Sequence, residues 1–310
     1  MSVQKIFAYL PKTIQDHLQQ VSSYFPLNNI EEIRFRIGRP IEVTANRKTV
    51  FLPYSLSREE AEQIMEKLSN HSFYTLDEEL RRGYITIDGG HRVGLAGRVI
   101  LDGGKVKGIR EVSSFNIRIA REKIGVAEEY IQFLFDSGWH HTMIIGPPQS
   151  GKTTFLRDLA RIISTGVKQH NIPPFKVGIV DERSEIAGSV NGVPQLTFGP
   201  RIDVLDGCPK AEGMMMMIRS MSPDVLIVDE IGRKEDTEAI LEAVHAGVRL
   251  MMTTHGESLE EIKQRPSLQP IVRQEIFTRF IELSRRNGTH MIVTIKNQQG
   301  EEILRKVSVP

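Results

Sequence analysis

The sequence predicts an α/β protein of two domains. A smaller α+β domain is expected over residues 1–125, followed by a domain over residues 126–310 with a mainly parallel sheet flanked by helices. Two observations lead to this prediction. At 310 residues, the chain is long enough to form two hydrophobic cores. From about residue 126 onward, short and continuously apolar segments alternate with helical ones, which is typical of a parallel sheet covered on both faces.

The N-terminal domain is expected to combine strands, a capped helix and a hairpin. Residues 30–45 alternate between apolar and polar side chains on both sides of a central turn, which predicts two strands. Ser57 and Glu60 precede an apolar pattern of helical spacing, and their separation of three residues predicts a capping box. A hairpin is predicted at Gly89 and Gly90, because glycines adopt the positive φ angles of a tight turn.

In the C-terminal domain, four apolar segments are predicted to form parallel strands. They are residues 141–146, 176–181, 224–230 and 249–255. A helix is expected over residues 127–138, and residues 280–307 are expected to add antiparallel strands at one edge of the sheet. The turns of this tail are predicted at residues 287–288 and 299–300, which are Asn-Gly and Gln-Gly pairs.

Composition restricts the possible functions. Hydrophobic residues make up 40% of the chain and charged residues 25%, and the net charge of +1 creates no field that would attract nucleic acid or an anionic membrane. The single cysteine, Cys208, excludes an internal disulfide and fits a reducing compartment. The start of the chain lacks the pattern of a secretory signal, and no apolar run approaches the ~18 residues that span a bilayer. A cytoplasmic protein is therefore expected.

A glycine-rich turn follows the first predicted parallel strand and matches the phosphate-binding pattern G-x-x-x-x-G-K-[ST]. The residues expected to bind ATP are Gly146, Pro147, Pro148, Gln149, Ser150, Gly151, Lys152, Thr153 and Thr154. The glycines let successive backbone N–H groups point at phosphate oxygens, and the following helix adds the positive end of its dipole. Lys152 is expected to lie between the outer phosphates as a catalytic residue, and the Thr153 hydroxyl to coordinate Mg²⁺.

Two carboxylates follow the apolar strand formed by residues 225–228. They are Asp229 and Glu230, and side chains at the carboxyl end of a parallel strand reach the ligand crevice. We expect Asp229 to hold Mg²⁺ and Glu230 to polarise the attacking water. An acid directly after the metal-binding aspartate favours hydrolysis over phosphoryl transfer to a small molecule. The open alternative is that both acids only cap the next helix.

Two further strand ends carry polar residues that are expected beside the first two motifs. One carries Asp181, Glu182 and Glu185, and the other Thr253, Thr254 and His255. Glu182 and His255 are therefore additional candidate catalytic residues. His255 or Thr254 could contact the γ-phosphate or its water and so report whether that phosphate is present. For Glu185, pairing with a surface arginine is an open alternative.

The order of these four motifs resembles the secretion and type IV pilus ATPase superfamily. Over residues 140–256 the resemblance is strong: "IVDERSE" resembles the acidic box, residues 218–247 the Walker B region, and "RLMMTTHG" the histidine box. The resemblance implies a RecA-like ATPase domain, a separate N-terminal domain and assembly into a hexameric motor. The chain departs from the superfamily at Asp229, where glycine is frequent.

Five segments narrow the resemblance to the stage III sporulation AA family, essentially from end to end. They are "IEEIRFRIGRPIEV", "GGHRVGLAGRVI", "GPPQSGKTTFLRDLAR", "VDERSEIAG" and "GPRIDVLDGCPKAEGM". The resemblance implies an ATPase encoded with membrane channel components that are built between mother cell and forespore. It further implies a homo-hexamer that acts from the mother-cell cytoplasm, at the inner face of the membrane, on membrane-embedded sporulation or secretion components.

The resemblance also makes three arginines candidates for stabilising charge on the γ-phosphate. In secretion ATPases such arginine fingers come from the N-terminal domain or a neighbouring subunit, and a finger adds ~10³–10⁵ in rate. The candidates here are Arg92, Arg98 and Arg118. Arginines on strands are most often solvated surface charges, and this alternative stays open for each of them.

Two other functions stay open as alternatives. One is a nucleic-acid-translocating or remodelling AAA+ ATPase, since Arg34, Arg36 and Arg39 form a basic cluster around Phe35. Strand alternation places Arg34 and Arg36 on the same face, as expected for ordinary solvated charges, so nucleic acid is not the favoured partner. The other alternative is a scaffold that binds ATP only to fold or assemble.

Overall fold

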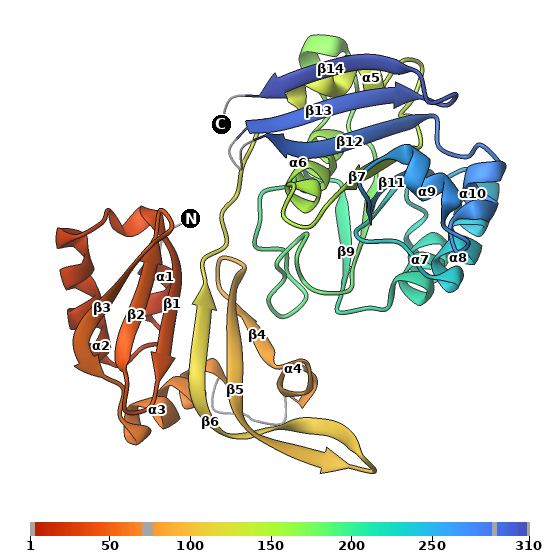
Figure 1. The fold of residues 1–310 in the computed structure, drawn as a ribbon. Helices are drawn as coiled ribbons and strands as arrows, with labels where there is room; N and C mark the ends of the chain where they lie inside the picture. The colour runs from red at the N-terminus through yellow and green to blue at the C-terminus, as the bar shows by residue number, and fades with distance from the viewer. Residues whose placement is uncertain (1–3, 70–76, 287–289, 309–310) are drawn as a thin grey trace. The chain divides into compact units, whose positions relative to one another are not determined.

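The computed structural model describes residues 4–69, 77–286 and 290–308. The chain forms two compact units. Unit 1 comprises Met1–Glu122 and Gly188–Asn191, and unit 2 comprises Lys123–Ala187 and Gly192–Pro310. Each unit has its own sheet and its own hydrophobic core, so the two are described separately (Figure 1).

Unit 1 is built on an antiparallel sheet of six strands in the order β3-β2-β1-β6-β5-β4 (Figure 1). The strands are β1 (Ile30–Arg36), β2 (Pro40–Ala45), β3 (Lys48–Ser55), β4 (Tyr84–Ile87), β5 (His91–Asp102) and β6 (Lys105–Arg118). The described helices are α1 (Gln4–Phe7), α2 (Lys12–Gln19), α3 (Arg58–Leu68) and α4 (Asp77–Arg82), with 3-10 turns η1 (Gln20–Ser23) and η2 (Leu27–Asn29). The core joins Ile14 of α2 and Ile64 of α3 to Phe35 and Phe115 of the sheet.

Two local predictions for this unit are confirmed. At the start of α3, the Ser57 hydroxyl accepts from the Glu60 N–H at 3.1 Å, and the Glu60 carboxylate accepts from the Ser57 N–H at 3.0 Å, which completes the capping box. The hairpin between β4 and β5 turns at Gly89 and Gly90, with φ angles of 84° and 72°. Both features depend on residues close in sequence, which is why they could be predicted.

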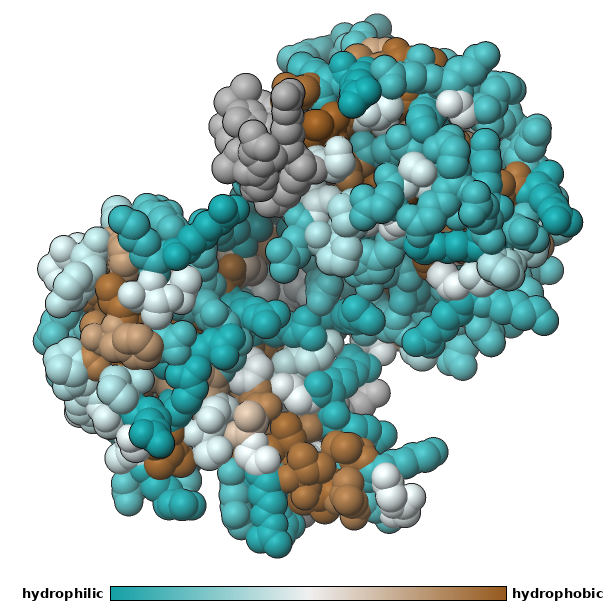
Figure 2. Space-filling view, viewed as in Figure 1, coloured by the Kyte–Doolittle hydropathy of each residue, from teal (hydrophilic) through white to brown (hydrophobic). Residues whose placement is uncertain are grey.

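The hairpin formed by β5 and β6 extends past its neighbours in the sheet. Within the described strands, residues 84–87 of β4 pair with residues 91–94 of β5. Strand β1 pairs with residues 114–118 of β6. The exposed apolar side chains on this hairpin are Val99, Leu101 and Val106, at 47%, 63% and 44% exposure. Figure 2 shows the apolar surface that gathers on this part of unit 1.

Unit 2 is built on an eight-stranded sheet in the order β14-β13-β12-β7-β11-β10-β8-β9 (Figure 1). Its strands are β7 (Thr142–Gly146), β8 (Val177–Asp181), β9 (Ile202–Asp206), β10 (Val225–Val228), β11 (Arg249–His255), β12 (Arg279–Arg286), β13 (His290–Asn297) and β14 (Glu302–Ser308). The described α-helices are α5 (Ile131–Leu134), α6 (Lys152–Thr165), α7 (Lys210–Met221), α8 (Lys234–His245), α9 (Leu259–Gln264) and α10 (Gln269–Arg273). The 3-10 turns are η4 (Glu128–Tyr130) and η5 (Lys168–His170).

The mainly parallel sheet confirms the predicted fold class. Strands β12, β7, β11, β10, β8 and β9 pair in parallel, while β13 and β14 are antiparallel. All of the 280–307 tail was expected to be antiparallel, so this expectation was wrong for β12, which pairs with β7 in parallel. The turn at residues 299–300 is confirmed by the Gly300 φ of 90°, and the turn predicted at 287–288 lies outside the described residues.

Two elements of unit 2 differ from the sequence expectation. Strand β9 was not predicted, because its five residues are too short and too polar to give a clear apolar run. The helix expected over residues 127–138 is reduced to η4 and α5. It stops because Phe135 turns to an extended conformation and packs edge-on against Trp139, with ring centroids 5.2 Å apart.

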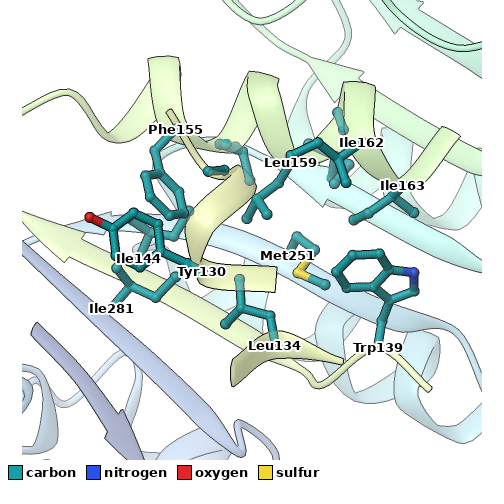
Figure 3. Packing of buried hydrophobic residues seen from close by; sticks show 14 of the residues in the cluster. Tyr130, Leu134, Trp139, Ile144, Phe155, Leu159, Ile162, Ile163, Met251 and Ile281 are labelled. Carbon is teal, nitrogen blue, oxygen red and sulfur yellow. The ribbon is translucent and has the colours of Figure 1, made fainter. Parts of the chain in front are cut away.

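Apolar side chains cover both faces of the unit 2 sheet. On one face, Phe155, Leu159 and Ile162 of α6 pack towards Ile144 and Met251 of the strands (Figure 3). On the other face, α7 and α8 cover a second cluster, to which they contribute Met214, Met217 and Ile240. Alternate strand residues therefore enter two cores, which holds the polar strand ends in fixed register. In the described part of the chain, no helix is both long and apolar enough to cross a bilayer.

Candidate functional site

The glycine-rich turn connects the carboxyl end of β7 to the start of α6. Gly151 has a φ of 103° and Gln149 one of 63°, both in the left-handed region that L side chains rarely adopt. A Cβ at Gly146 would lie 2.5 Å from the Ser150 hydroxyl and 2.6 Å from the Leu283 carbonyl oxygen. Glycines are therefore required where the chain bends most tightly, and the bend aims the start of α6 into the space above the sheet.

Lys152 is the first residue of α6, and its side chain folds back over the turn. It is 5% exposed, and its ammonium donates to the carbonyl oxygens of Gly146 and Pro147 at 2.8 and 2.9 Å. A third donor reaches the His255 Nδ1 at 3.1 Å. Burial lowers the pKa of this ammonium, while the carboxylates of Asp229 and Glu230 oppose that shift. The cation is thus held at the centre of the turn by acceptors that a phosphate can replace.

Asp229 joins the turn to two neighbouring strands. Its Oδ2 accepts from the Thr153 hydroxyl at 2.6 Å, and its Oδ1 accepts from the Thr253 hydroxyl on β11. Thr253 also accepts from the Glu230 N–H at 2.8 Å. Thr253 received no specific role from the sequence, although its position at a strand end was noted. It orients both acidic residues at the end of β10.

Both carboxylate oxygens of Glu230 are engaged. Oε1 lies 2.9 Å from the His255 Nε2, and Oε2 accepts from the Arg183 guanidinium at 3.0 Å. Glu230 has a φ of 55°, so the backbone turns sharply after the strand and brings its side chain back over the sheet edge. Arg183 was not predicted. The signal available in the sequence was its place inside the acidic segment "VDERSE".

The two acidic residues at the end of β8, Asp181 and Glu182, are held in different ways. Asp181 is 2% exposed and accepts from the N–H groups of Glu185, Ile186 and Ala187 at 2.8–2.9 Å, so it fixes the turn after β8. Burial raises the pKa of the Asp181 carboxyl to about 6. Glu182 instead forms an ion pair with Lys210 at the start of α7.

Seven residues at the carboxyl edge of the sheet line one small cavity. It is lined by Asp181, Glu182, Arg183, Glu185, Lys210, Asp229 and Glu230. Glu182 therefore lies beside the Asp229 and Glu230 pair, as the strand order predicts. Thr254 points elsewhere, because its hydroxyl is fully buried and donates to the Ile231 carbonyl oxygen at 3.0 Å.

The other turn residues differ in accessibility. Pro148 and Gln149 are exposed at the tip, and Thr154 is half-buried in the first turn of α6. Ser150 is 2% exposed, and within the described residues its hydroxyl has no hydrogen-bond partner. An unpaired buried hydroxyl inside an anion-binding turn is what a bound phosphate or its hydration water would satisfy.

The three candidate arginines all lie in unit 1. Arg92 on β5 stacks over the Tyr84 ring, with its guanidinium carbon 3.3 Å from the ring centroid. Arg98 lies 3.8 Å from the Glu111 carboxylate, and its side chain is 76% exposed. Arg118 lies 4.0 Å from the Glu32 carboxylate at 67% exposure. The last two pairs are long and solvated, so they hold their guanidinium groups only weakly.

The donor set suits Mg²⁺ bound together with phosphates. Among the described residues, no group of three or more His, Cys, Asp or Glu side chains could enclose a metal alone. Mg²⁺ in nucleotide sites needs only one or two protein oxygen ligands, because phosphates and waters complete its octahedron. The Thr153 hydroxyl and the Asp229 carboxylate, in contact at 2.6 Å beside the turn, fit this requirement.

These features define the class: a RecA-like α/β fold with a glycine-rich turn at the carboxyl edge of its parallel strands. Solved structures share this fold. The chain matches the X-ray structure of the Legionella pneumophila ATPase DotB at TM-score 0.58 and 16% identity, covering 97% of this chain and 81% of that one. It matches the crystal structure of the pilus retraction motor PilT with bound ADP at TM-score 0.59 and 13% identity, covering 100% and 83%.

Sequence comparison shows the family. The family model for sporulation stage III, protein AA matches residues 2–303, and the chain belongs to that family. It is 53% identical to stage III sporulation protein AA of Bacillus subtilis (strain 168) over 305 residues, 98% of each chain. A more distant relative is the protein SEEDLING PLASTID DEVELOPMENT 1 of Arabidopsis thaliana, at 30% identity over 52% of this chain and 23% of that protein.

Proposed function

We propose that the chain is a Mg²⁺-dependent ATPase that hydrolyses ATP to ADP and phosphate. The observation that carries the proposal is the contact between the P-loop hydroxyl of Thr153 and the Asp229 carboxylate, 2.6 Å apart, beside the buried ammonium of Lys152. A cation, a metal-binding pair and an anion-binding turn thereby meet at one sheet edge. Residues 126–310 form the ATPase domain in this proposal, and residues 1–125 an accessory domain.

Each site residue receives a chemical role. The backbone N–H groups of residues 146–154 cradle the phosphates, and Lys152 exchanges its carbonyl acceptors for phosphate oxygens. Thr153 and Asp229 would hold Mg²⁺, which would supply neutralisation of the phosphate charge. Glu230 orients and deprotonates the attacking water, while Glu182 shapes the charge of the same cavity. His255 reports the γ-phosphate to Glu230.

Phosphate release by the purified full chain tests this activity. We expect hydrolysis of ATP with Mg²⁺ and none with excess EDTA, with restoration when Mg²⁺ is added back. Turnover that is unchanged by EDTA would contradict the proposed metal dependence. ATP binding without any turnover would instead favour the scaffold alternative.

The ATPase is further proposed to power assembly of a channel, or transport through it, during endospore formation. Membership of the sporulation stage III protein AA family supports this role, and so does the fold shared with DotB and PilT. The proposed form is a homo-hexamer in the mother-cell cytoplasm that docks on membrane-embedded channel components. An arginine from the accessory domain of the same or a neighbouring subunit completes the site.

Two measurements test the assembly and its partner. Size-exclusion chromatography with light scattering should give a hexamer with a non-hydrolysable ATP analogue, and a monomer under all conditions would contradict the ring. Crosslinking in sporulating cells that carry Glu230→Gln should capture membrane channel proteins. Recovery of nucleic acid instead, with steep salt dependence in filter binding, would favour the nucleic-acid motor.

A further inference from the structure

We propose that Arg183 is a positioning residue that, together with His255, holds Glu230 in a resting orientation until ATP binds. This inference rests on the proposed ATPase function and concerns the regulation of that site. The starting observation is that both Glu230 carboxylate oxygens are occupied, one by the His255 Nε2 at 2.9 Å and one by Arg183 at 3.0 Å. Each contact uses one acceptor site of its oxygen, and together the two contacts hold the carboxylate in one orientation.

A continuous chain of contacts links the phosphate turn to this carboxylate. The Lys152 ammonium can only donate, so the His255 Nδ1 that lies 3.1 Å from it must act as the acceptor. The ring proton is then on Nε2, which points at Glu230. The tautomer of His255 is therefore set by Lys152, and the hydrogen bond from His255 to Glu230 depends on that tautomer.

Arg183 supplies the second half of the restraint. Its side chain is 58% exposed, whereas that of Glu230 is 22% exposed, so the pair lies at the mouth of the cavity. The other cation lining the cavity, Lys210, is engaged by Glu182. Arg183 is thus the guanidinium that neutralises Glu230 in this arrangement. An ion pair of this exposure contributes a modest stabilisation and can open readily.

Phosphate binding would release the restraint through Lys152. An ammonium is attracted more strongly to an anionic phosphate oxygen than to a neutral imidazole nitrogen, because attraction between opposite charges adds to the hydrogen bond. Lys152 therefore leaves the His255 Nδ1 when the outer phosphates of ATP arrive. His255 is then free to turn towards the γ-phosphate, and Glu230 keeps only its exposed pair with Arg183. ATP shifts the population of Glu230 from the resting to the reactive orientation.

The first test is steady-state ATP hydrolysis by Arg183→Gln in the full chain. Loss of the ion pair should raise kcat by about two- to fivefold with little change in KM, which a folding defect cannot imitate. Arg183→Lys keeps the charge and should restore kcat to near the original value. Arg265→Gln, which removes a half-buried ion pair with Glu261 on α9, is the control and should leave both constants unchanged. An unchanged or lower kcat for Arg183→Gln overturns the inference.

The second test does not depend on turnover. In ¹⁵N-histidine NMR of the nucleotide-free chain, with His255 assigned by its loss in His255→Gln, the ring should be the Nε2–H tautomer. Adding the non-hydrolysable analogue AMP-PNP should shift its Nδ1 resonance, and Lys152→Ala should abolish the tautomer preference. A mixed tautomer in the nucleotide-free chain overturns the restraint even if the chain hydrolyses ATP. Absence of Mg²⁺-dependent hydrolysis in the unmodified chain would instead remove the proposed function.

Discussion

The candidate site residues of the two units are held in opposite ways. At the strand ends of unit 2, Lys152 is buried. Its ammonium donates to acceptors at the ends of β7 and β11 and interacts electrostatically with Asp229 at the end of β10. In unit 1, Arg98 and Arg118 stand on solvated strand surfaces and reach their acidic neighbours only at 3.8 and 4.0 Å. The difference is one of desolvation, since a buried charge must be satisfied by several precise contacts while a surface charge need not be.

A role can be assigned to a residue whose contacts depend on those of its neighbours. The unit 2 contacts are mutually dependent: Thr253 orients both Asp229 and Glu230, and His255 joins Glu230 to Lys152. Such a network has a defined geometry without a ligand, so roles can be assigned to its members. An exposed arginine has no comparable geometry, and its role has to be assigned by experiment.

The largest expected effect tests the buried cation. Lys152→Ala should lower ATP turnover by about 10³-fold, because a preorganised charge in a water-excluded site is lost at the outer phosphates. Phosphate release by the purified chain measures the effect. Lys168→Ala changes an exposed lysine of the same unit and should leave turnover unchanged. If the Lys152 variant hydrolysed ATP as fast as the unmodified chain, the buried charge would be no more important for turnover than a solvated one.

The next effect tests the role of the Glu230 carboxylate. Glu230→Gln should lower kcat by about 10²–10³-fold while retaining ATP affinity, since the amide cannot accept the proton of the attacking water. Fluorescent-nucleotide binding and phosphate release together separate these outcomes. Glu238→Gln on α8 is a suitable control, because that glutamate is exposed and pairs only loosely with Lys234 at 3.8 Å. Loss of ATP binding in the Glu230 variant would argue for a binding role instead.

A third prediction addresses the solvated arginines. Among the candidates, Arg92 is held over Tyr84, and Arg98 lies on the extended part of the β5–β6 hairpin. Arg118 is also exposed and only weakly paired, but its backbone is fixed between β1 and β5 in the body of the sheet, so its guanidinium is presented from a defined position. We expect Arg118→Ala to lower kcat at least tenfold, as for an arginine finger, and Arg98→Ala to change it less than twofold. The reverse order of effects would assign the arginine finger to Arg98, on the extended part of the hairpin.

The smallest expected effect is the pH dependence of stability contributed by His141, a buried residue outside the glycine-rich turn. Burial lowers the pKa of His141 to about 4, with nearby Arg249 and His140 adding to the shift. Because its folded pKa lies below the unfolded value of about 6.5, the stability it contributes is present above pH 6.5. That stability is lost as the pH falls through 4.

Urea unfolding at pH 7.5 and pH 5, followed by the fluorescence of Trp139, measures this dependence in unit 2. At pH 5 the part of the loss that His141 contributes should be about 2 kcal/mol, which is the difference in pH dependence between the unmodified chain and His141→Gln. His141→Gln should remove that part of the pH dependence, while substitution of the exposed His170 should preserve it. A variant as sensitive to pH as the original chain would assign the effect to other groups.

Local sequence specified much of this molecule. The capping box at Ser57 and the glycine turn before α6 both follow from backbone conformations that only a few residue types adopt. Continuous apolar strands likewise predicted the parallel sheet and the edge at which Glu230 and His255 meet. Strand β9 escaped prediction because a short polar edge strand resembles a loop, and the helix after residue 127 was overestimated because Phe135 leaves it to pack on Trp139.

By itself, therefore, the sequence determined the glycine-rich turn, the acidic strand ends and the family to which the chain belongs. Only the tertiary structure decided which of these groups touch. Lys152 and His255 are 103 positions apart, and Arg183 and Glu230 are 47 apart, yet each pair is in contact. The physical reason is that local conformation depends on neighbouring residues, whereas these contacts depend on strand order and on burial of the two cores that fix the strands in register.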